Sequence, residues 1–277
     1  MNIDYDKIKS ILNKNGFYFE KRYGQNFLTD EKLLNELVEK AGVTASDTVI
    51  EIGVGAGTLT AALAKKAKRV IGYEIDKKLQ PVLKETLADY KNAEIVFKDI
   101  MKEPMSEIES RAGGRFSVVA NLPYYITTPV LMRFIEESKA VDKIAVTVQE
   151  EVADRLCAKS ATADYGAITV AINAVGSAEK VMRIDRSRFM PAPNVDSAVA
   201  VINIDRDKYP DLDYKAFREV VKSAFSSRRK TLANNLMRDF SLSREKAESA
   251  VFAVKGDIKA RGETLTAEEF IRLYKLL

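Results

Sequence analysis

The stretch "TVIEIGVGAGTLTAALAKKA" (residues 48–67) changes character twice, and it decides the fold class. It opens with an apolar, β-branched run at 48–55, which is typical of a buried strand. Alternating glycines at 53–57 end that run, and the alanine-rich amphipathic run at 58–67 is typical of a helix. A strand, a glycine loop and a helix in direct succession predict the first half of a βαβ unit.

The same alternation of strand and helix continues along the chain. A second amphipathic run lies at 77–90, and runs at 178–185 and 196–205 predict a strand pair joined by a proline-rich connection. Apolar strands separated by helices are buried on both faces, so we expect an α/β fold with a Rossmann-like, doubly wound parallel sheet. Further strand-like runs lie at 69–75, 94–100, 116–121 and 143–150.

The pattern changes after the polar, turn-rich segment at 205–213, beyond which it is helical throughout. We therefore expect two domains, with an α/β domain at 1–206 and a small all-helical C-terminal domain at 207–277. The first residues, "MNIDYDKIKSILNKNG", mix charged with apolar residues and predict an amphipathic helical extension rather than a signal peptide.

Two absences from the composition restrict the chemistry. The 277 residues include no histidine and a single cysteine, which excludes imidazole catalysis, histidine-ligated zinc and iron–sulfur clusters. We accordingly expect no metal, and Cys157 is predicted to be a small packing residue on a helix. No apolar stretch is long enough to span a membrane, so a cytoplasmic location with no membrane partner is expected.

The excess positive charge is confined to the C-terminal quarter. Residues 207–277 carry 15 Lys and Arg against 11 Asp and Glu, and the remainder of the chain is neutral. This asymmetry predicts a polyanionic partner for the C-terminal part. Arg228, Arg229 and Lys230 are expected on one helix, where they would span about 200° and could not all face a core.

Polar residues and glycines stand where the first three predicted strands end. Gly53, Gly55 and Gly57 follow the first strand, Glu74 ends the second, and Asp99 ends the third. Because ligands bind at the carboxyl ends of parallel strands, the loop and the two acids suit a ligand with a ribose and an adenine. Each feature alone is also compatible with a tight turn or a solvated strand end, and both NAD and S-adenosylmethionine qualify.

The fourth strand ends in "NLPY", residues 121–124, which distinguishes the two ligands. The exocyclic N6 of adenine is a poor nucleophile because its lone pair is delocalised into the ring. An amide oxygen of Asn121 and the carbonyl of Leu122, fixed by Pro123, could accept both N6 hydrogens and localise that lone pair. Tyr124 offers an aromatic face on which an extruded base can stack. This chemistry needs no histidine.

Six segments resemble the KsgA/RsmA family of small-subunit rRNA adenine N6,N6-dimethyltransferases. They are "KRYGQNFL" (21–28), "EIGVGAGTLT" (51–60), "YEID" (73–76), "NLPYYITTP" (121–129), "RFMPAPNVDSAV" (188–199) and "FSSRRKTLANNL" (225–236). The resemblance implies a class I methyltransferase sheet with S-adenosylmethionine as cofactor. It also implies that Phe189 stacks on the second face of the target base.

The resemblance and the strand-end pattern together nominate three groups of residues. The predicted catalytic group is Asn121, Leu122, Pro123, Tyr124 and Phe189. The predicted cofactor-binding group is Gln25, Asn26, Leu28, Gly53, Gly55, Gly57, Glu74, Ile75, Asp99, Ile100 and Asn121. The predicted RNA-binding group is Arg228, Arg229 and Lys230.

The activity implied is methyl transfer to N6 of two adjacent adenosines in the hairpin loop near the 3′ end of 16S rRNA, giving N6,N6-dimethyladenosines. Unstacked loop bases suit such an enzyme because flipping them costs less than opening a duplex. The partner implied is the small-subunit rRNA in a pre-30S particle, with a role in small-subunit biogenesis. No dimerisation stripe is visible, and we expect a monomer.

Other functions stay open at this point. A large-subunit rRNA methyltransferase of the macrolide-resistance type shares the glycine loop, but its usual tetrapeptide has Ile in place of Leu122. A ribosome-assembly factor without needed catalysis could share the whole fold. A DNA adenine methyltransferase shares the chemistry, and an NAD dehydrogenase is disfavoured by the loop spacing and the lack of histidine.

Overall fold

The computed structural model describes residues 5–19 and 25–277, and the chain forms two compact units. The first unit comprises Met1–Ala153 and Glu179–Asn203, and the second comprises Asp154–Ala178 and Ile204–Leu277. The second unit therefore includes a segment that the sequence pattern assigned to the α/β domain. The last passage between the units, after Asn203, lies close to the expected boundary at 206.

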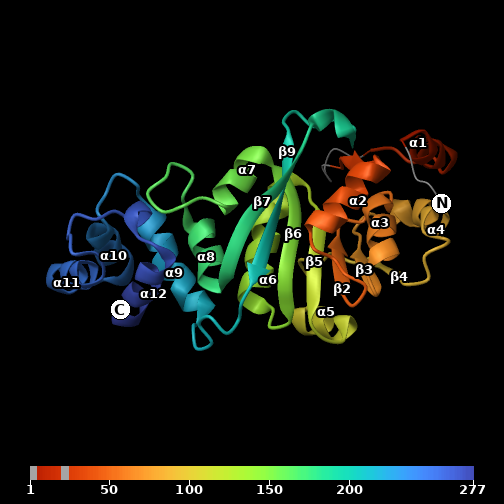
Figure 1. The fold of residues 1–277 in the computed structure, drawn as a ribbon. Coiled ribbons are helices and arrows are strands. Elements are labelled where there is room, and N and C mark those ends of the chain that lie inside the picture. Colours follow the sequence, from red (N-terminus) through yellow and green to blue (C-terminus); the bar gives the residue numbers. More distant parts are fainter. Residues whose placement is uncertain (1–4, 20–24) are drawn as a thin grey trace. The chain divides into compact units, whose positions relative to one another are not determined.

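The first unit is built on a seven-stranded sheet with the order β4-β3-β2-β5-β6-β9-β7 (Figure 1). Strands β4, β3, β2, β5 and β6 run parallel, and β9 pairs antiparallel with β6. The expected α/β class with a Rossmann-like parallel sheet is confirmed. The strands are β2 (Thr48–Ile52), β3 (Arg69–Tyr73), β4 (Ala93–Val96), β5 (Phe116–Asn121), β6 (Val141–Gln149), β7 (Gly176–Ile184) and β9 (Ser197–Ile204).

The sheet is apolar because helices cover it. Leu59 and Leu63 on α3 share one buried cluster with Val49 and Val70 on the strands, and Phe134 on α6 meets Phe116 of β5 edge to face. Such burial contributes about 1.5–3 kcal/mol for each large apolar side chain. The helices that begin in this unit are α1 (Tyr5–Lys14), α2 (Glu31–Lys40), α3 (Thr58–Lys66), α4 (Gln80–Thr86), α5 (Met105–Ala112), α6 (Thr127–Glu137) and α7 (Glu150–Leu156).

The N-terminal amphipathic helix is confirmed for residues 5–14; residues 1–4 lie outside the described part. Ile8, Ile11 and Leu12 are buried and share a cluster with Val82 and Leu83 of α4. The spacing of these residues places all three on one face of α1, which explains why Lys9 and Lys14 face solvent.

A second, two-stranded sheet joins segments that are distant in the sequence. Strand β1 (Phe27–Leu28) pairs antiparallel with β8 (Phe189–Met190), so that Leu28 lies opposite Phe189 and Phe27 opposite Met190. The sequence pattern did not predict this pair, because two-residue strands show no periodicity. It brings the N-terminal segment against the connection between β7 and β9.

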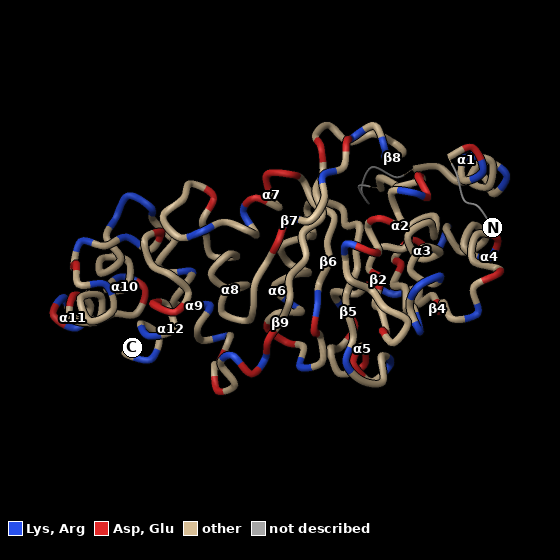
Figure 2. Tube along the Cα trace, in the orientation of Figure 1, with Lys and Arg blue, Asp and Glu red and all other residues tan. Residues whose placement is uncertain are grey.

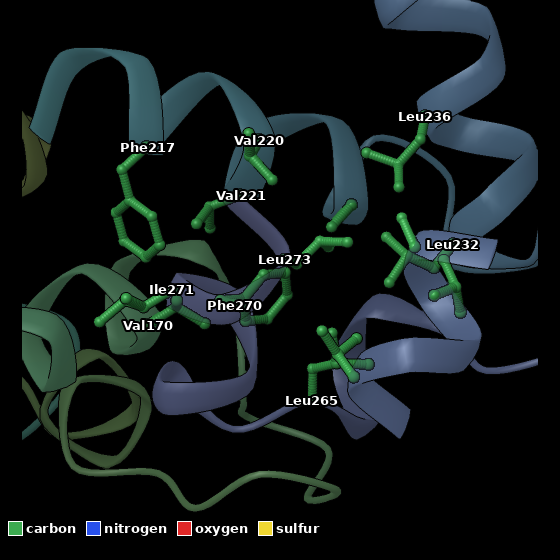
Figure 3. Packing of buried hydrophobic residues seen from close by; sticks show 14 of the residues in the cluster. Val170, Phe217, Val220, Val221, Leu232, Leu236, Leu265, Phe270, Ile271 and Leu273 are labelled. Atoms are coloured by element: carbon green, nitrogen blue, oxygen red, sulfur yellow. The ribbon is translucent and has the colours of Figure 1, made fainter. Parts of the chain in front are cut away.

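The second unit is helical, with a core of apolar side chains from all five helices (Figure 3). Phe217, Phe270 and Leu273 lie at its centre and are almost fully buried. α8 packs against α9 and α12, which explains why this apolar segment belongs here rather than to the sheet. The helices are α8 (Ala167–Val175), α9 (Tyr214–Phe225), α10 (Leu232–Phe240), α11 (Arg244–Lys255) and α12 (Ala267–Leu276).

The expectation of one continuous helix carrying Arg228, Arg229 and Lys230 is wrong. α9 ends at Phe225 and α10 begins at Leu232, so the three basic residues lie in the turn between them. Thr231 ends the turn as the N-cap of α10, where its hydroxyl accepts a hydrogen bond from the N–H of Asn234. A Ser-Ser pair and an N-capping threonine are the local reasons for the break.

Basic and acidic residues are interspersed along both units rather than segregated by element (Figure 2). No helix within residues 5–19 and 25–277 combines the length and the apolar composition that crossing a membrane requires.

Candidate functional site

A cavity of about 360 Å³ lies at the carboxyl ends of the parallel strands in the first unit. This is the end of an open α/β sheet at which ligands bind, and the volume falls within the range of small-molecule sites. The cavity is lined by residues 25–28, 51–55, 58–59, 73–75, 98–101 and 121–126 and by Phe189.

The glycine loop after β2 forms one wall. Gly53, Gly55 and Gly57 have φ angles of 76°, 57° and 83°, which side chains rarely allow. A Cβ on Gly55 would lie 2.7 Å from the ring of Phe27, so the loop and β1 approach each other more closely than any other residue would permit. Gly57 does not line the cavity; a Cβ there would meet Leu83 on α4.

Glu74 follows β3 directly and is held by the backbone. The N–H of Gly55 donates to its Oε2 and the N–H of Asp76 to its Oε1, each at 2.8 Å. Burial raises the pKa of Glu74, and the hydrogen bonds from these amides oppose the rise. Each oxygen keeps a second lone pair, so the carboxylate can accept hydrogen bonds from two adjacent hydroxyl groups.

Asp99 lies in a loop rather than at a strand end, because β4 ends at Val96. The N–H of Met101 donates to its Oδ1 at 3.0 Å. Arg133 on α6 supports the loop from outside the cavity, donating to the carbonyl oxygens of Ile100 and Glu103. The carboxylate of Asp99 is therefore presented by a braced loop.

Asn121 is the last residue of β5, and its amide is oriented by the N-terminal segment. Its Nδ2 donates to the carbonyl oxygen of Asn26 at 2.9 Å. Because the amide group is planar, engaging the NH₂ in this way fixes the direction of Oδ1, which remains an acceptor. Pro123 then holds the chain extended at φ −54° and ψ 130° before a short 3₁₀ turn, Tyr124–Ile126, leads into α6.

Tyr124 is held by a contact with Ser197 that no local sequence pattern indicates. Its hydroxyl lies 2.9 Å from the Oγ of Ser197, the first residue of β9, which is fully buried. Burial raises the pKa of Tyr124, so the phenol stays neutral. Both the ring and its hydroxyl therefore have a defined place at the cavity wall.

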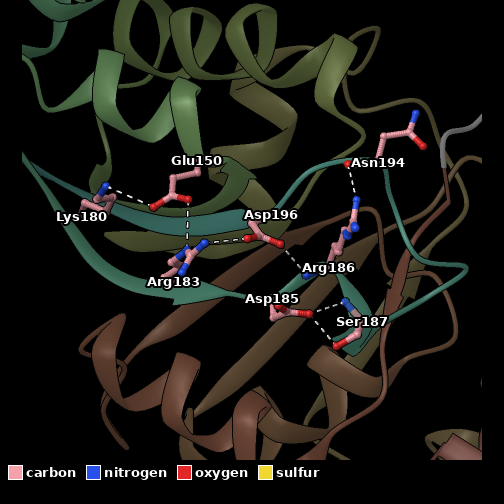
Figure 4. A network of polar contacts seen from close by, with 8 residues as sticks. All are labelled: Glu150, Lys180, Arg183, Asp185, Arg186, Ser187, Asn194 and Asp196. Atoms are coloured by element: carbon pink, nitrogen blue, oxygen red, sulfur yellow. Dashed lines mark hydrogen bonds and ion pairs between the residues drawn. The ribbon is translucent and has the colours of Figure 1, made fainter.

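Phe189 reaches the same cavity from the connection between β7 and β9. It is buried, pairs with Leu28 through the β1–β8 ladder, and follows Arg188, whose guanidinium lies 2.8 Å from Asp30. The connection is closed by a polar network centred on Asp196 (Figure 4).

Glu51 is a wall residue that the sequence analysis missed. It lies on β2, is fully buried, and neither carboxylate oxygen has a hydrogen-bond partner among the described residues. Burial raises its pKa to about 8; the Thr60 hydroxyl opposes the rise without reaching hydrogen-bond geometry, and the charge of Glu74 adds to it. An acid inside the apolar run "TVIEI" was the available signal.

The cavity thus brings together most of the nominated residues. Lys98, Met101 and Tyr125 also line it without having been predicted. Residues 21–24 of the first resembling segment lie outside the described residues. The nominated residues at the cavity wall are Gln25, Asn26, Leu28, Gly53, Gly55, Glu74, Ile75, Asp99, Ile100, Asn121, Leu122, Pro123, Tyr124 and Phe189.

The α9–α10 turn belongs to the second unit and is not part of this cavity. Arg228 donates to the carbonyl oxygens of Ala163 and Tyr165, so it braces a neighbouring loop. Arg229 and Lys230 are exposed. In the part of the chain that the structure describes, no three acidic or cysteine side chains converge as they would to hold a metal ion.

Comparison with known proteins gives consistent results. The profile of the family described as "Ribosomal RNA adenine dimethylase" matches residues 16–277. Proteins named "Ribosomal RNA small subunit methyltransferase A" from Bacillus cytotoxicus and Geobacillus thermodenitrificans are 44% and 42% identical, each over 98% of this chain and 96% and 95% of their own.

Two solved structures are similar over most of their length. The 23S rRNA methyltransferase ErmE matches with a TM-score of 0.69 and 28% identity, over 91% of this chain and 99% of its own. A dimethyladenosine transferase from Plasmodium falciparum matches with a TM-score of 0.76 over 89% of this chain and 95% of its own; at 24% identity it supports the fold alone.

Proposed function

The chain belongs to the ribosomal RNA adenine dimethylase family, and from that premise we propose which bases it modifies and how. We propose that it methylates N6 of two adjacent adenosines in the hairpin loop near the 3′ end of small-subunit rRNA, giving N6,N6-dimethyladenosines. The observation that carries the proposal is the oriented amide of Asn121 at the wall of the strand-end cavity.

S-adenosylmethionine is the proposed cofactor, and when bound it supplies a methyl group on a sulfonium. The acidic residues at the cavity wall fit this cofactor. Glu74 would accept hydrogen bonds from the two ribose hydroxyls, and Asp99 would accept one from the exocyclic amine of the adenine. Gly53 and Gly55 would admit the cofactor close to the backbone, and residues 25–28 would cover it. Ile75 and Ile100 would flank its adenine, and Gly57 would support the loop from behind.

The target base would enter between Tyr124 and Phe189. The Oδ1 of Asn121 and the carbonyl of Leu122 would accept the two N6 hydrogens, which draws the nitrogen lone pair out of the ring. Because the nitrogen loses its proton readily once methylated, the residues at the wall need not include a strong base. Placing nitrogen and methyl carbon in line would contribute much of the rate.

Two alternatives remain for comparison. ErmE, which is similar in structure, is a 23S rRNA methyltransferase, but at 28% identity it is further from this chain than the small-subunit relatives at 42–44%. An assembly factor without needed catalysis would have no use for the Asn121–Asn26 hydrogen bond or for the buried acids. Both observations support the small-subunit enzyme, and a role in small-subunit biogenesis is compatible with it.

For RNA binding we propose a modified assignment of the three basic residues. Arg229 and Lys230 would contact phosphates, while Arg228 would act partly through the loop that it braces. The partner proposed is small-subunit rRNA in a pre-30S particle in the cytoplasm, bound by a monomer. Contacts to phosphate would make binding salt-dependent.

Methyl transfer from labelled S-adenosylmethionine to unmethylated small subunits tests the proposal. We expect four methyl groups per particle, two on each of two adjacent adenosines near the 3′ end of the rRNA, located by nucleotide mapping. Labelling of isolated large-subunit rRNA instead would establish the first alternative. Absence of transfer to any particle, with cofactor still bound, would establish the second.

A further inference from the structure

The polar network around Asp196 has no part in the proposed chemistry, yet it joins the two ends of the connection that carries Phe189, and Asp196 directly precedes the serine that contacts Tyr124. We propose that Asp196 and Ser197 form a positioning hub that sets the gap between Tyr124 and Phe189. The inference rests on the proposed function, in which these two rings hold the target base.

The first half of the hub acts on Tyr124. The Oγ of Ser197 lies 2.9 Å from the Tyr124 hydroxyl, and Ser197 is fully buried on β9, paired with Gln149 of β6. Strand β9 lies between β6 and β7 in the sheet, so the backbone of Ser197 is held by the sheet. The hydrogen bond therefore ties the hydroxyl end of the tyrosine ring to the seven-stranded sheet.

The second half acts on Phe189 through Asp196, the preceding residue. One carboxylate oxygen of Asp196 accepts from the N–H of Arg186 at 3.0 Å, and the other lies 2.7 Å from the guanidinium of Arg183 (Figure 4). Arg186 also donates to the carbonyl of Asn194 at 3.0 Å. These contacts join the two ends of the connection that carries Phe189, so the position of its ring depends on them.

The hub is in turn anchored to β6 and α7. The N–H of Glu150 donates to the carbonyl of Asp196 at 3.1 Å, and its carboxylate lies 3.1 Å from Arg183 and 3.7 Å from Lys180. Of two consecutive residues, Ser197 thus contacts Tyr124 through its hydroxyl, and Asp196 contacts the start of the Phe189 connection through its carboxylate. A stable connection alone could be held by contacts at any position along it. Here the contacts are made by Asp196, which is adjacent to the residue that contacts Tyr124.

A defined distance between the rings of Tyr124 and Phe189 matters because the base that they hold changes between the two methyl transfers. After the first transfer the N6 atom carries a methyl group and a single hydrogen, so only one of the two proposed acceptors can still bind it before the second. If Asp196 and Ser197 no longer positioned the two rings, the enzyme would release the monomethylated base more often. The ratio of monomethyl to dimethyl product therefore reports the hub, and a general loss of stability would not change it.

The experiment compares Ser197→Ala, Tyr124→Phe and their double variant with wild-type protein. An RNA hairpin carrying 8-vinyladenosine, a fluorescent adenosine that retains its 6-amino group, at the target position serves as the probe, because stacking between aromatic rings quenches it. We expect each single variant to lower kcat/KM about fivefold to tenfold, as for one lost hydrogen bond. The double variant should be no worse than either, because both lose the same contact.

Asp196→Asn is matched with Asp142→Asn, which makes the same change in another aspartate bound to an arginine, Arg115, outside the cavity. We expect Asp196→Asn to raise the monomethyl product at least threefold and to reduce the quenching, with affinity for S-adenosylhomocysteine within twofold of wild type. Asp142→Asn should leave all three unchanged.

Equal product ratios and equal quenching in the Asp196 and Asp142 variants would overturn the hub, as would additive effects of the Ser197 and Tyr124 substitutions. If wild-type protein itself failed to quench the probe, the proposed stacking between Tyr124 and Phe189 would fail instead. The two failures are therefore distinguishable.

Discussion

The two walls of the cavity are built in different ways. The wall proposed for the cofactor is local: Glu74 accepts from the backbone of Gly55 and Asp76, 19 and 2 residues away. The wall proposed for the target base is assembled from distant segments, since Asn121 donates to Asn26 and Tyr124 meets Ser197, 95 and 73 residues away.

This difference indicates what each wall can tolerate. Backbone amides hold an acid without any side chain, so the cofactor wall should depend mainly on glycine conformations. Side-chain contacts across long separations depend on the whole first unit being folded, so the base wall should be sensitive to single substitutions.

The largest effect is expected at the base wall, for Asn121→Ala. Loss of a preorganised acceptor should lower the single-turnover rate of methyl transfer about 10²- to 10³-fold. Affinity for S-adenosylhomocysteine, measured by calorimetry, should fall only a few-fold. If both quantities fell equally, Asn121 would serve mainly the cofactor and the two walls would not be separate.

At the cofactor wall, Glu51→Gln should change how stability depends on pH. The pKa of Glu51, about 8, lies above its ordinary value of 4.5, so the folded state binds the proton more tightly than the unfolded state. Its contribution is therefore present below pH 4.5 and is lost as pH rises towards 8. The variant should be more stable than wild type by roughly 2–5 kcal/mol above pH 8 and about equal near pH 4.5, as measured by urea unfolding. A constant difference at all pH values would contradict this.

Gly55→Ala tests whether the cofactor wall depends on glycine. A non-glycine residue at positive φ costs about 1–3 kcal/mol, and the contact with Phe27 adds about as much. Gly16→Ala is the matched control, since Gly16 has a φ of 61° against 57° but nothing within 4 Å of its Cβ position. We expect both variants to be less stable thermally, but only Gly55→Ala to lose cofactor affinity, by tenfold or more. Equal cofactor affinities of the two variants would show that cofactor binding does not depend on the close approach of the glycine loop to Phe27.

The smallest effect is expected outside both walls, for Arg229→Gln combined with Lys230→Gln. Removing two phosphate contacts should weaken rRNA binding and reduce the slope of log affinity against log salt by about 1–2. Cofactor affinity and thermal stability should not change. Arg228→Gln should instead lower stability, because Arg228 donates to two carbonyl oxygens. An unchanged salt slope would move the RNA contact elsewhere.

The same contrast explains what could be predicted from the sequence. Glycines, strand-end acids and the "NLPY" motif are local, so their clustering at one sheet edge followed from the βαβ alternation alone. Glu51 was not predicted because it lies within β2, whereas the pattern that indicates ligand-binding residues concerns strand ends. Ser197 lies in the resembling segment at 188–199, but nothing in that segment indicates its contact with Tyr124. The β1–β8 ladder likewise joins two resembling segments whose pairing no local pattern indicates.

The errors in the helical part have a similar origin. Residues 214–240 have a nearly continuous helical pattern, and only the Ser-Ser pair at 226–227 and the capping role of Thr231 mark the break that places Arg228–Lys230 in a turn. α8 was assigned to the wrong neighbourhood because an apolar helix beside a sheet resembles any other crossover helix. Its partners α9 and α12 begin only at residues 214 and 267, well beyond the end of α8 at residue 175.

The interleaving of Asp154–Ala178 with the C-terminal helices has a consequence for biosynthesis. When this segment leaves the ribosome, the helices that bury Tyr165, Val170 and Ala174 have not yet been made. These apolar side chains therefore stay exposed on the nascent chain until the last helix, α12, has been synthesised. A truncation after residue 206 would make the exposure permanent and should aggregate, whereas one that also replaces 154–178 with a short polar linker should remain in solution.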